Sequence, residues 1–195
     1  MNFLKKLFKS YTESSKEEIN HHPVNLSLDD LFVHNFINKG GKFLYSTSIN
    51  EVIINLENIL KENNWTQITC TDFDLLKIMQ QIPIHTLNSP KKTVPFFTTC
   101  EHLIANKGDI LFSSNQLGSH KINELPDCFI VYATTSQLVK NTSEGLTGIK
   151  THFSGNIPTN ISSVTNYTIQ RNNDDFLNYG NSNSKILYLL LFEDL

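Results

Sequence analysis

Apolar positions along the chain alternate between a helical and an extended spacing. Residues 51–62 place apolar side chains every three or four positions, which predicts an amphipathic helix with Ser48 or Asn50 as its N-cap. Residues 128–133 and 186–192 are instead continuous apolar runs, which are typical of strands buried on both faces of a sheet. We therefore expect these two strands to lie at the centre of one sheet.

The remaining elements predict an α/β protein. Asp72 is placed to cap a shorter helix that runs to Met79, and residues 134–136 are placed to open a helix that runs towards Gly145. Strands that alternate with helices favour an open, mainly parallel sheet with helices on both faces, to which a hairpin at residues 105–112 adds antiparallel strands. The other predicted strands comprise residues 43–45, 65–70, 82–87, 96–99 and 110–112.

The first 25 residues differ from the rest of the chain. Residues 3–11 carry apolar side chains at helical spacing together with Lys5, Lys6 and Lys9, which predicts a short basic amphipathic helix, and a polar linker follows. This helix either packs on the globular domain or on a second copy in a homodimer, or it docks on a membrane surface or a partner. Residues 26–195 are expected to form one α/β domain, because a chain of this length can bury a single core.

Composition and charge argue against several classes of protein. The formal net charge of −3 and the pI near 6.1 give no electrostatic case for binding nucleic acid. Cys70, Cys100 and Cys128 are widely spaced, so we expect no zinc, no iron–sulfur cluster and no other cofactor. The odd cysteine count, together with the lack of a signal-peptide core or of an apolar run near ~20 residues, favours a cytoplasmic protein.

Polar residues gather at two turns beside apolar strands. The turn at residues 106–109 contains Gly108, which is free to take a positive φ, and Lys107, which can hold an anion or remain solvated. Residues 134–136 offer three hydroxyl groups at the carboxyl end of a strand, where they can bind an anion or simply cap a helix. Glu101 is a weak candidate for a catalytic carboxylate. The residues expected to form a pocket for an anionic small molecule are Asn106, Lys107, Gly108, Asp109, Ser113, Ser114, Asn115, Thr134, Thr135 and Ser136.

Three segments carry a resemblance to a known family. Residues 100–109 lie where the family motif reads C-D-x-x-I-A-E-T-G-T, and residues 125–131 resemble its L-P-x-x-H-I-V-V segment. Residues 136–139 lie where that family opens its next helix with D-I-V. From about Leu44 to its C-terminus, the chain resembles the LUD-domain family of lactate-utilisation protein C, also termed DUF162. The resemblance implies an open α/β fold similar to the superfamily of ribose-phosphate isomerase and CoA-transferase.

The resemblance also implies a place in oxidative lactate metabolism, beside iron–sulfur partner proteins. At residues 106–109 the family's Glu-Thr-Gly-Thr is replaced by Asn-Lys-Gly-Asp, and residues 161–176 contain no counterpart of its G-P-S-x-T-x-D-I-E motif. We therefore predict a non-catalytic accessory factor in lactate utilisation or related electron-transfer metabolism. The alternatives are an enzyme or sensor for a phosphorylated or acyl-CoA-like metabolite, with Glu101 as nucleophile or base, and a membrane-surface module.

Overall fold

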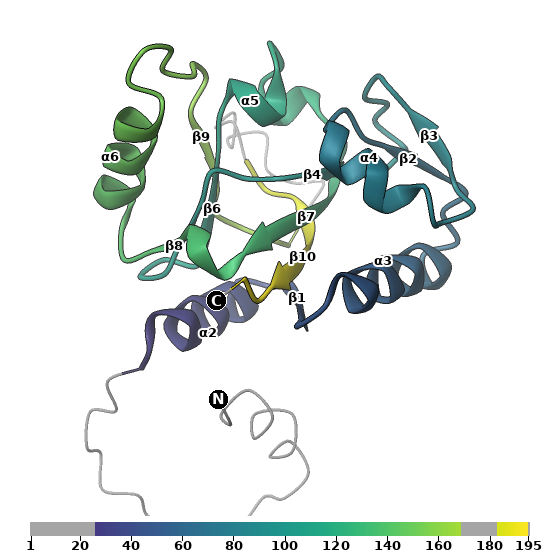
Figure 1. Cartoon of the computed structure of the whole chain (residues 1–195), viewed down its shortest axis with the longest axis horizontal. Helices are drawn as coiled ribbons and strands as arrows, with labels where there is room; N and C mark the ends of the chain where they lie inside the picture. Colours follow the sequence, from purple (N-terminus) through teal and green to yellow (C-terminus); the bar gives the residue numbers. More distant parts are fainter. Residues whose placement is uncertain (1–25, 169–182, 195) are drawn as a thin grey trace, which may run out of the picture.

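One large parallel sheet forms the centre of the molecule. The computed structural model describes residues 26–168 and 183–194 (Figure 1), so the helix and linker predicted at residues 1–25 lie outside the described residues. Six strands pair in the order β1-β10-β7-β4-β2-β3, and every pair is parallel. These strands are β1 (Lys42–Ser46), β2 (Gln67–Thr69), β3 (His85–Leu87), β4 (Phe96–Thr98), β7 (Cys128–Thr134) and β10 (Ile186–Phe192).

The two continuous apolar runs lie inside this sheet, which confirms the prediction. β10 and β7 are both 7 residues long and pair along their whole length. Val131 and Leu189 enter the hydrophobic core on one face of the sheet, whereas Ile130 and Leu190 enter the core on the other face. A strand that is buried on both faces needs apolar side chains at every position, which explains why these runs do not alternate.

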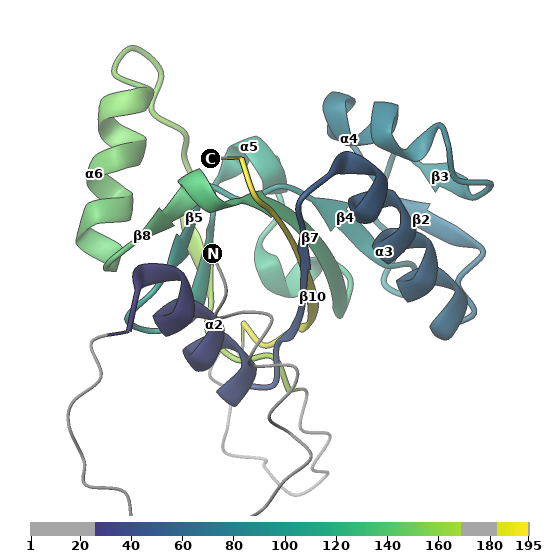
Figure 2. The same cartoon turned by 60° about the horizontal axis from the view of Figure 1, so that its bottom comes forward.

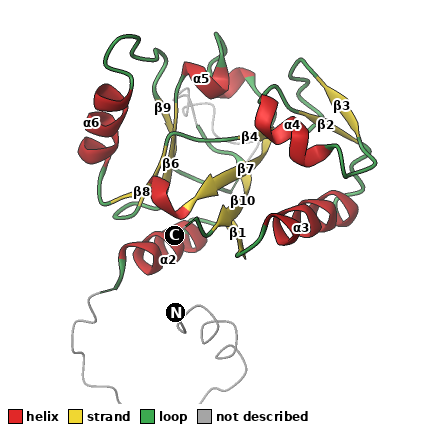
Figure 3. Cartoon of the chain, in the orientation of Figure 1, coloured by secondary structure: helices red, strands yellow, loops and turns green. Residues whose placement is uncertain are grey.

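Two helices cover one face of the large sheet (Figure 3). α3 (Ile49–Glu62) begins after Ser48, whose side chain accepts a backbone hydrogen bond, so Ser48 rather than Asn50 is the N-cap. α4 (Phe73–Met79) begins after Asp72, which accepts hydrogen bonds from two backbone amides in the first turn. Both caps lie where the sequence pattern places them, because capping depends on residues within one turn.

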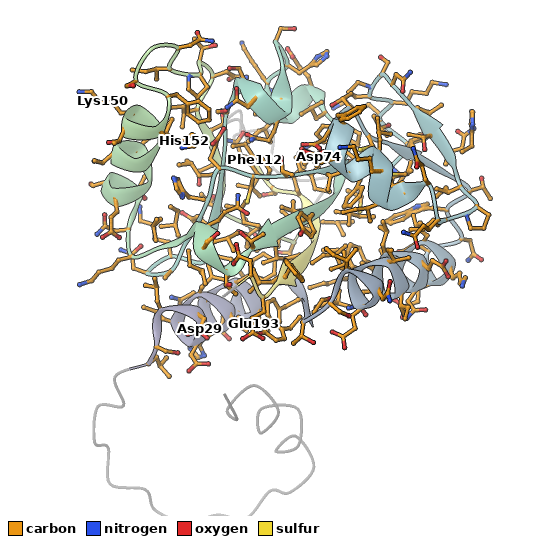
Figure 4. All side chains as sticks on the ribbon, in the orientation of Figure 1. Asp29, Asp74, Phe112, Lys150, His152 and Glu193 are labelled. Atoms are coloured by element: carbon orange, nitrogen blue, oxygen red, sulfur yellow. The ribbon has the colours of Figure 1, made fainter. Side chains whose placement is uncertain are left out.

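The other face of the large sheet packs against a second, smaller sheet. Phe112 points from this second sheet into the space between the two, where its ring meets Phe129 of β7 edge-on at 5.8 Å between centroids (Figure 4). α6 (Thr142–His152) covers the outer face of the second sheet, and α2 (Leu28–Asn38) packs at one end of the two sheets (Figure 2). The predicted hairpin therefore belongs to a sheet of its own. In order, its strands are β8 (Leu138–Val139), β5 (His102–Ile104), β6 (Asp109–Phe112) and β9 (Ser162–Val164).

The prediction that a helix begins at residues 134–136 is wrong. The chain forms a single 3₁₀ turn at Thr135–Gln137, after which β8 pairs in parallel with β5. The α-helix begins after Asn141, whose side chain accepts a hydrogen bond from the backbone amide of Glu144. Hydroxyl groups at positions 134–136 gave a local capping signal, but the pairing of the next two apolar residues with a neighbouring strand outweighs it.

Candidate functional site at the carboxyl edge of the large sheet

The carboxyl ends of the parallel strands meet at one edge of the large sheet. After β2 the chain passes to α4 on one face, whereas after the neighbouring β4 it passes to β5 and the second sheet on the opposite face. Open α/β sheets bind ligands at such a point, where neighbouring strands send the chain in opposite directions. Asp72 and Thr99 lie on either side of it, and Thr99 Oγ1 donates a hydrogen bond to Asp72 Oδ2 at 3.3 Å.

Glu101 follows β4 at this edge and is held by three donors. Its Oε1 accepts hydrogen bonds from Ser113 Oγ at 2.5 Å, Asn115 Nδ2 at 2.9 Å and Gln116 Nε2 at 3.1 Å. Within residues 26–168 and 183–194, no donor bonds to its second oxygen, Oε2. A carboxylate that is fixed through one oxygen and free at the other has the geometry of a general base, a nucleophile or a ligand-binding group. We call Glu101, Ser113, Asn115 and Gln116 the Glu101 cluster.

The short helix α5 (Ser114–Leu117) builds this cluster. β6 ends at Phe112, and the next residue, Ser113, is the N-cap of α5 and is fully buried. Gln116 bonds back to the backbone N–H of Ser113, which completes a capping box. Gln116 was not among the predicted site residues, although a serine followed three positions later by glutamine is the signature of this arrangement.

Gln137 links the Glu101 cluster to the turn after β7. Its Nε2 donates hydrogen bonds to the carbonyl oxygens of Cys100 at 2.5 Å and Glu101 at 3.3 Å, and its Oε1 accepts one from the backbone N–H of Thr134 at 2.8 Å. The side chain therefore fixes the backbone on which Glu101 is carried. Gln137 was also missed, and again it follows a threonine by three positions, as in a capping box.

The hydroxyl residues at the end of β7, Thr134, Thr135 and Ser136, lie beside a carboxylate of this same chain. Asp194 follows β10 and accepts hydrogen bonds from Thr135 Oγ1 at 2.7 Å, Ser136 Oγ at 2.7 Å and Ser136 N at 3.0 Å. Slight desolvation opposes ionisation, but the hydrogen bonds from Ser136 and Thr135 lower the pKa of Asp194 to about 2. We call Thr134, Thr135 and Ser136 the hydroxyl cluster. Asp194 could not be foreseen as its partner, because it lies 58 positions after Ser136.

The turn at residues 106–109 has a different role, because it anchors α2. Gly108 has a φ of +66°, and a Cβ at this position would lie 2.4 Å from the backbone nitrogen of Phe36. Asp109 is buried and forms an ion pair with Lys39 at 2.6 Å. Tyr167 Oη also donates a hydrogen bond to the carbonyl oxygen of Gly108 at 2.6 Å. Gly108 and Asp109 therefore serve the packing of the protein, whereas Asn106 and Lys107 are exposed.

The structure brings some of the predicted site residues together and separates others. Ser113 and Asn115 contact Glu101, and Gln137 joins Thr134 of the hydroxyl cluster to the backbone carbonyl of Glu101. The turn at residues 106–109 lies at the other end of the β5–β6 hairpin, roughly 10 Å of strand away. Ser114 faces yet another segment, since its Oγ accepts the backbone N–H of Thr159. The three groups that were expected to share one pocket are thus divided between two ends of the hairpin.

The cysteines and the acidic residues do not form a metal or thiol site in the part of the chain that the structure describes. No group of three or more His, Cys, Asp and Glu side chains there is placed to hold a metal ion. Burial raises the pKa of Cys70 to about 11, that of Cys128 to about 12 and that of Cys100 further still. The three thiols are free and protonated at neutral pH, and a protonated thiol is a poor nucleophile. None of the described helices has the length and apolar character needed to span a membrane.

Among known proteins, the chain is similar in fold to a solved structure. No family model matches the chain, and no curated protein matches it at a significant level. Among solved structures, the chain is similar to a DUF162 family protein from Deinococcus radiodurans, with a TM-score of 0.60 over 86% of this chain and 99% of that one. The identity is 11%, so the likeness concerns the fold alone. The chain has the open α/β fold of a DUF162 family protein.

Proposed function

We propose that this chain is an accessory protein of lactate utilisation or a related electron-transfer pathway, acting beside an iron–sulfur partner and not as a catalyst. The role in lactate metabolism comes from the motif resemblance at residues 100–109 and 125–131. An accessory role is favoured by the hydrogen bonds that polar side chains form within the chain at the carboxyl edge of the large sheet. There the hydroxyl cluster bonds to Asp194, and Glu101 bonds to its own neighbours through Oε1.

The anchoring of α2 by residues 106–109 supports the same proposal. In this chain, the segment that corresponds to the family's Glu-Thr-Gly-Thr core carries an ion pair and a close backbone contact with α2. Such contacts need Gly108 and Asp109 but leave them unavailable to a ligand. The change from the family motif is therefore consistent with a segment that has become structural.

A second function is favoured by one observation, the free oxygen of Glu101. Its position at the switch point between β2 and β4 is where a metabolite would bind, and Oε2 has no protein donor in the described residues. In this alternative, Glu101 is the base or nucleophile of an enzyme, or the ligand-binding group of a sensor, for a phosphorylated or acyl-CoA-like metabolite. The two proposals differ in whether the charge of Glu101 is needed.

A growth experiment separates the two proposals. Deletion of the gene in its host should slow growth on lactate as sole carbon source and leave growth on glucose unchanged. Complementation with Glu101→Gln, which keeps the shape and one acceptor oxygen, should restore growth fully if the protein is an accessory factor. Failure of a soluble Glu101→Gln protein to restore growth would favour the metabolite-binding alternative. Unimpaired growth of the deletion strain on lactate would contradict the role in lactate utilisation.

The partner is tested by co-expression. Proteins encoded next to this gene that contain iron–sulfur cluster motifs are the candidates, and a stable complex should elute together with this chain on size exclusion and retain the visible absorbance of the cluster. The same column reports whether the isolated chain forms a homodimer. Elution of the chain apart from every such candidate would count against the accessory role.

A further inference from the structure

In the part of the chain that the structure describes, the large sheet ends at two open edge strands, which differ in how they are protected. β3 is 3 residues long and lies between Pro83 and Pro90, and proline at an edge hinders pairing with other strands. β1 is 5 residues long, contains no proline and lies between α2 and α3 (Figure 2). Its central residues Phe43, Leu44 and Tyr45 are only partly buried. An edge strand of this kind is a template for pairing with a further strand.

The backbone of β1 alternates between groups that face β10 and groups that face the open side. The carbonyl oxygen of Ser46 accepts a hydrogen bond from the backbone N–H of Glu193 at 2.9 Å, so the backbone groups of Ser46 point towards β10. Neighbouring residues of a strand direct these groups to opposite sides. The N–H and C=O groups of Phe43 and Tyr45 therefore point to the open side, where none of the described residues bonds to them.

The two ends of this open row are paired within the chain, and only its centre is left. The backbone N–H of Gly41 donates to the carbonyl oxygen of Phe36 in α2 at 3.0 Å. The backbone N–H of Thr47 donates to Glu51 Oε2 in α3 at 2.7 Å. The helices on either side of β1 thus close both ends of the row and leave a gap of the length of one short strand.

We propose that β1 is the self-association surface of this protein and pairs in antiparallel orientation with β1 of a second copy. In a pair centred on Leu44, Phe43 of one copy lies opposite Tyr45 of the other, and the two residues exchange two hydrogen bonds. The two-fold axis repeats this pair. Every open N–H and C=O group at the centre of the row is then satisfied, and the large sheets of the two copies form one continuous sheet.

The charges along β1 favour the antiparallel orientation. Lys42 is exposed at the amino end of the strand. Acidic residues gather at the carboxyl end, where Glu51 bonds to the backbone after the strand. Burial raises the pKa of Tyr45, and the nearby carboxylates of Glu193 and Asp29 raise it further. Antiparallel pairing brings Lys42 of each copy to the acidic end of the other, whereas parallel pairing would bring like charges together.

This inference goes beyond the accessory role, because it concerns how two copies associate and holds whether or not the chain acts in lactate metabolism. Analytical ultracentrifugation should detect a dimer at micromolar concentrations. In the dimer, the N–H groups of Phe43 and Tyr45 should exchange with solvent at least about tenfold more slowly than in the diluted protein. A monomer at every concentration, or a dimer in which both N–H groups exchange freely, would overturn the proposal. A monomer with both N–H groups protected would also overturn it, because another segment of the chain would then cover β1.

Proline on the open side of each edge strand gives a matched pair of variants. Tyr45→Pro removes one N–H from each copy and so two hydrogen bonds from the dimer, which should raise the apparent Kd at least about tenfold. Thr86→Pro is the control on β3. The carbonyl oxygen of Leu87 accepts the backbone N–H of Cys70 after β2, so Thr86 faces the open side, and its replacement should leave the dimer intact. Equal affinities of the two variants would overturn the assignment to β1.

Charge reversal tests the orientation without changing the backbone, and it serves even if Tyr45→Pro does not fold. Lys42→Glu places a negative charge against the acidic end of the other copy, so the apparent Kd at low salt should rise at least about threefold. Lys150→Glu makes the same change on α6, away from β1 (Figure 1), and should leave the Kd unchanged. A Kd that is indifferent to Lys42→Glu would overturn the antiparallel arrangement.

Discussion

The two ends of the β5–β6 hairpin carry similar polar residues and use them in opposite ways. At the turn end, Asp109 has only 7% of its side chain exposed and pairs with Lys39, the C-cap of α2. At the open end, Glu101 is partly exposed and bonds to neutral donors through Oε1, and no donor among the described residues bonds to its second oxygen. A buried carboxylate with a charged partner stabilises packing, whereas a partly exposed carboxylate with a free oxygen remains available to a ligand. Sequence alone gives both ends the same appearance of a polar turn beside apolar strands.

The largest expected effect is at the turn end. Gly108→Ala should lower the free energy of unfolding by about 3 kcal/mol or more, because it combines a positive φ with a contact between Cβ and the backbone of α2. Gly118→Ala is the matched control: Gly118 also has a positive φ, of +60°, but no atom lies within 4 Å of the added Cβ. It should cost about 2 kcal/mol, from the backbone strain of its φ of +60° and ψ of −130° alone. Urea unfolding measures both, and equal losses would show that the contact with α2 contributes nothing.

The next effect concerns the ion pair of the same turn. Asp109→Asn should destabilise the protein by about 2 kcal/mol, since Lys39 loses its counter-charge in a setting where 34% of its side chain is exposed. Asp74→Asn breaks an ion pair of similar length with Lys77. The side chain of Asp74 is 84% exposed and that of Lys77 is 56% exposed. That change should cost about 0.5 kcal/mol or less, because water screens the pair. If Asp109→Asn lowered the free energy of unfolding no more than Asp74→Asn does, burial would not strengthen the Lys39–Asp109 pair.

Local signals account for what the sequence predicted correctly. The strands at residues 128–133 and 186–192 and the caps Ser48 and Asp72 follow from composition and from contacts within one turn. The helix placed at residues 134–136 failed because strand pairing with β5, a distant contact, decided the structure there.

The candidate site shows the same division between local and distant contacts. Gln116 lies three positions after its partner Ser113, so the capping-box pattern could have revealed it. Gly108 was recognised as a turn glycine, but its contact with Phe36 of α2 joins residues 72 positions apart and leaves no local pattern. Asp194 was missed for the same reason, since the strand that precedes it had to be placed beside β7 first.

A smaller effect is expected at the open end. Ser113→Ala removes a fully buried hydroxyl that caps α5 and donates to Glu101, so it should cost about 1 kcal/mol. Glu101→Gln should cost less than that, because an amide oxygen can still accept the three hydrogen bonds. In a double-mutant cycle the two changes should be coupled, since the residues share a bond. Strictly additive losses would mean that Ser113 stabilises α5 without holding Glu101.

The smallest effect is expected at Asp194, and it depends on pH. Its pKa lies near 2 in the folded protein and at its ordinary value of 3.8 when no bonds are made, so ionisation favours the folded state. The stabilisation is complete above pH 4 and is lost as the pH falls towards 2. Because Asp194 is exposed, screening keeps the contribution below about 1 kcal/mol. Urea unfolding of Asp194→Asn and the unmodified protein should therefore differ slightly at pH 6, and the difference should shrink as the pH falls from 4 towards 2. A difference that persists unchanged at acid pH would mean that the carboxylate is not what the hydroxyl cluster recognises.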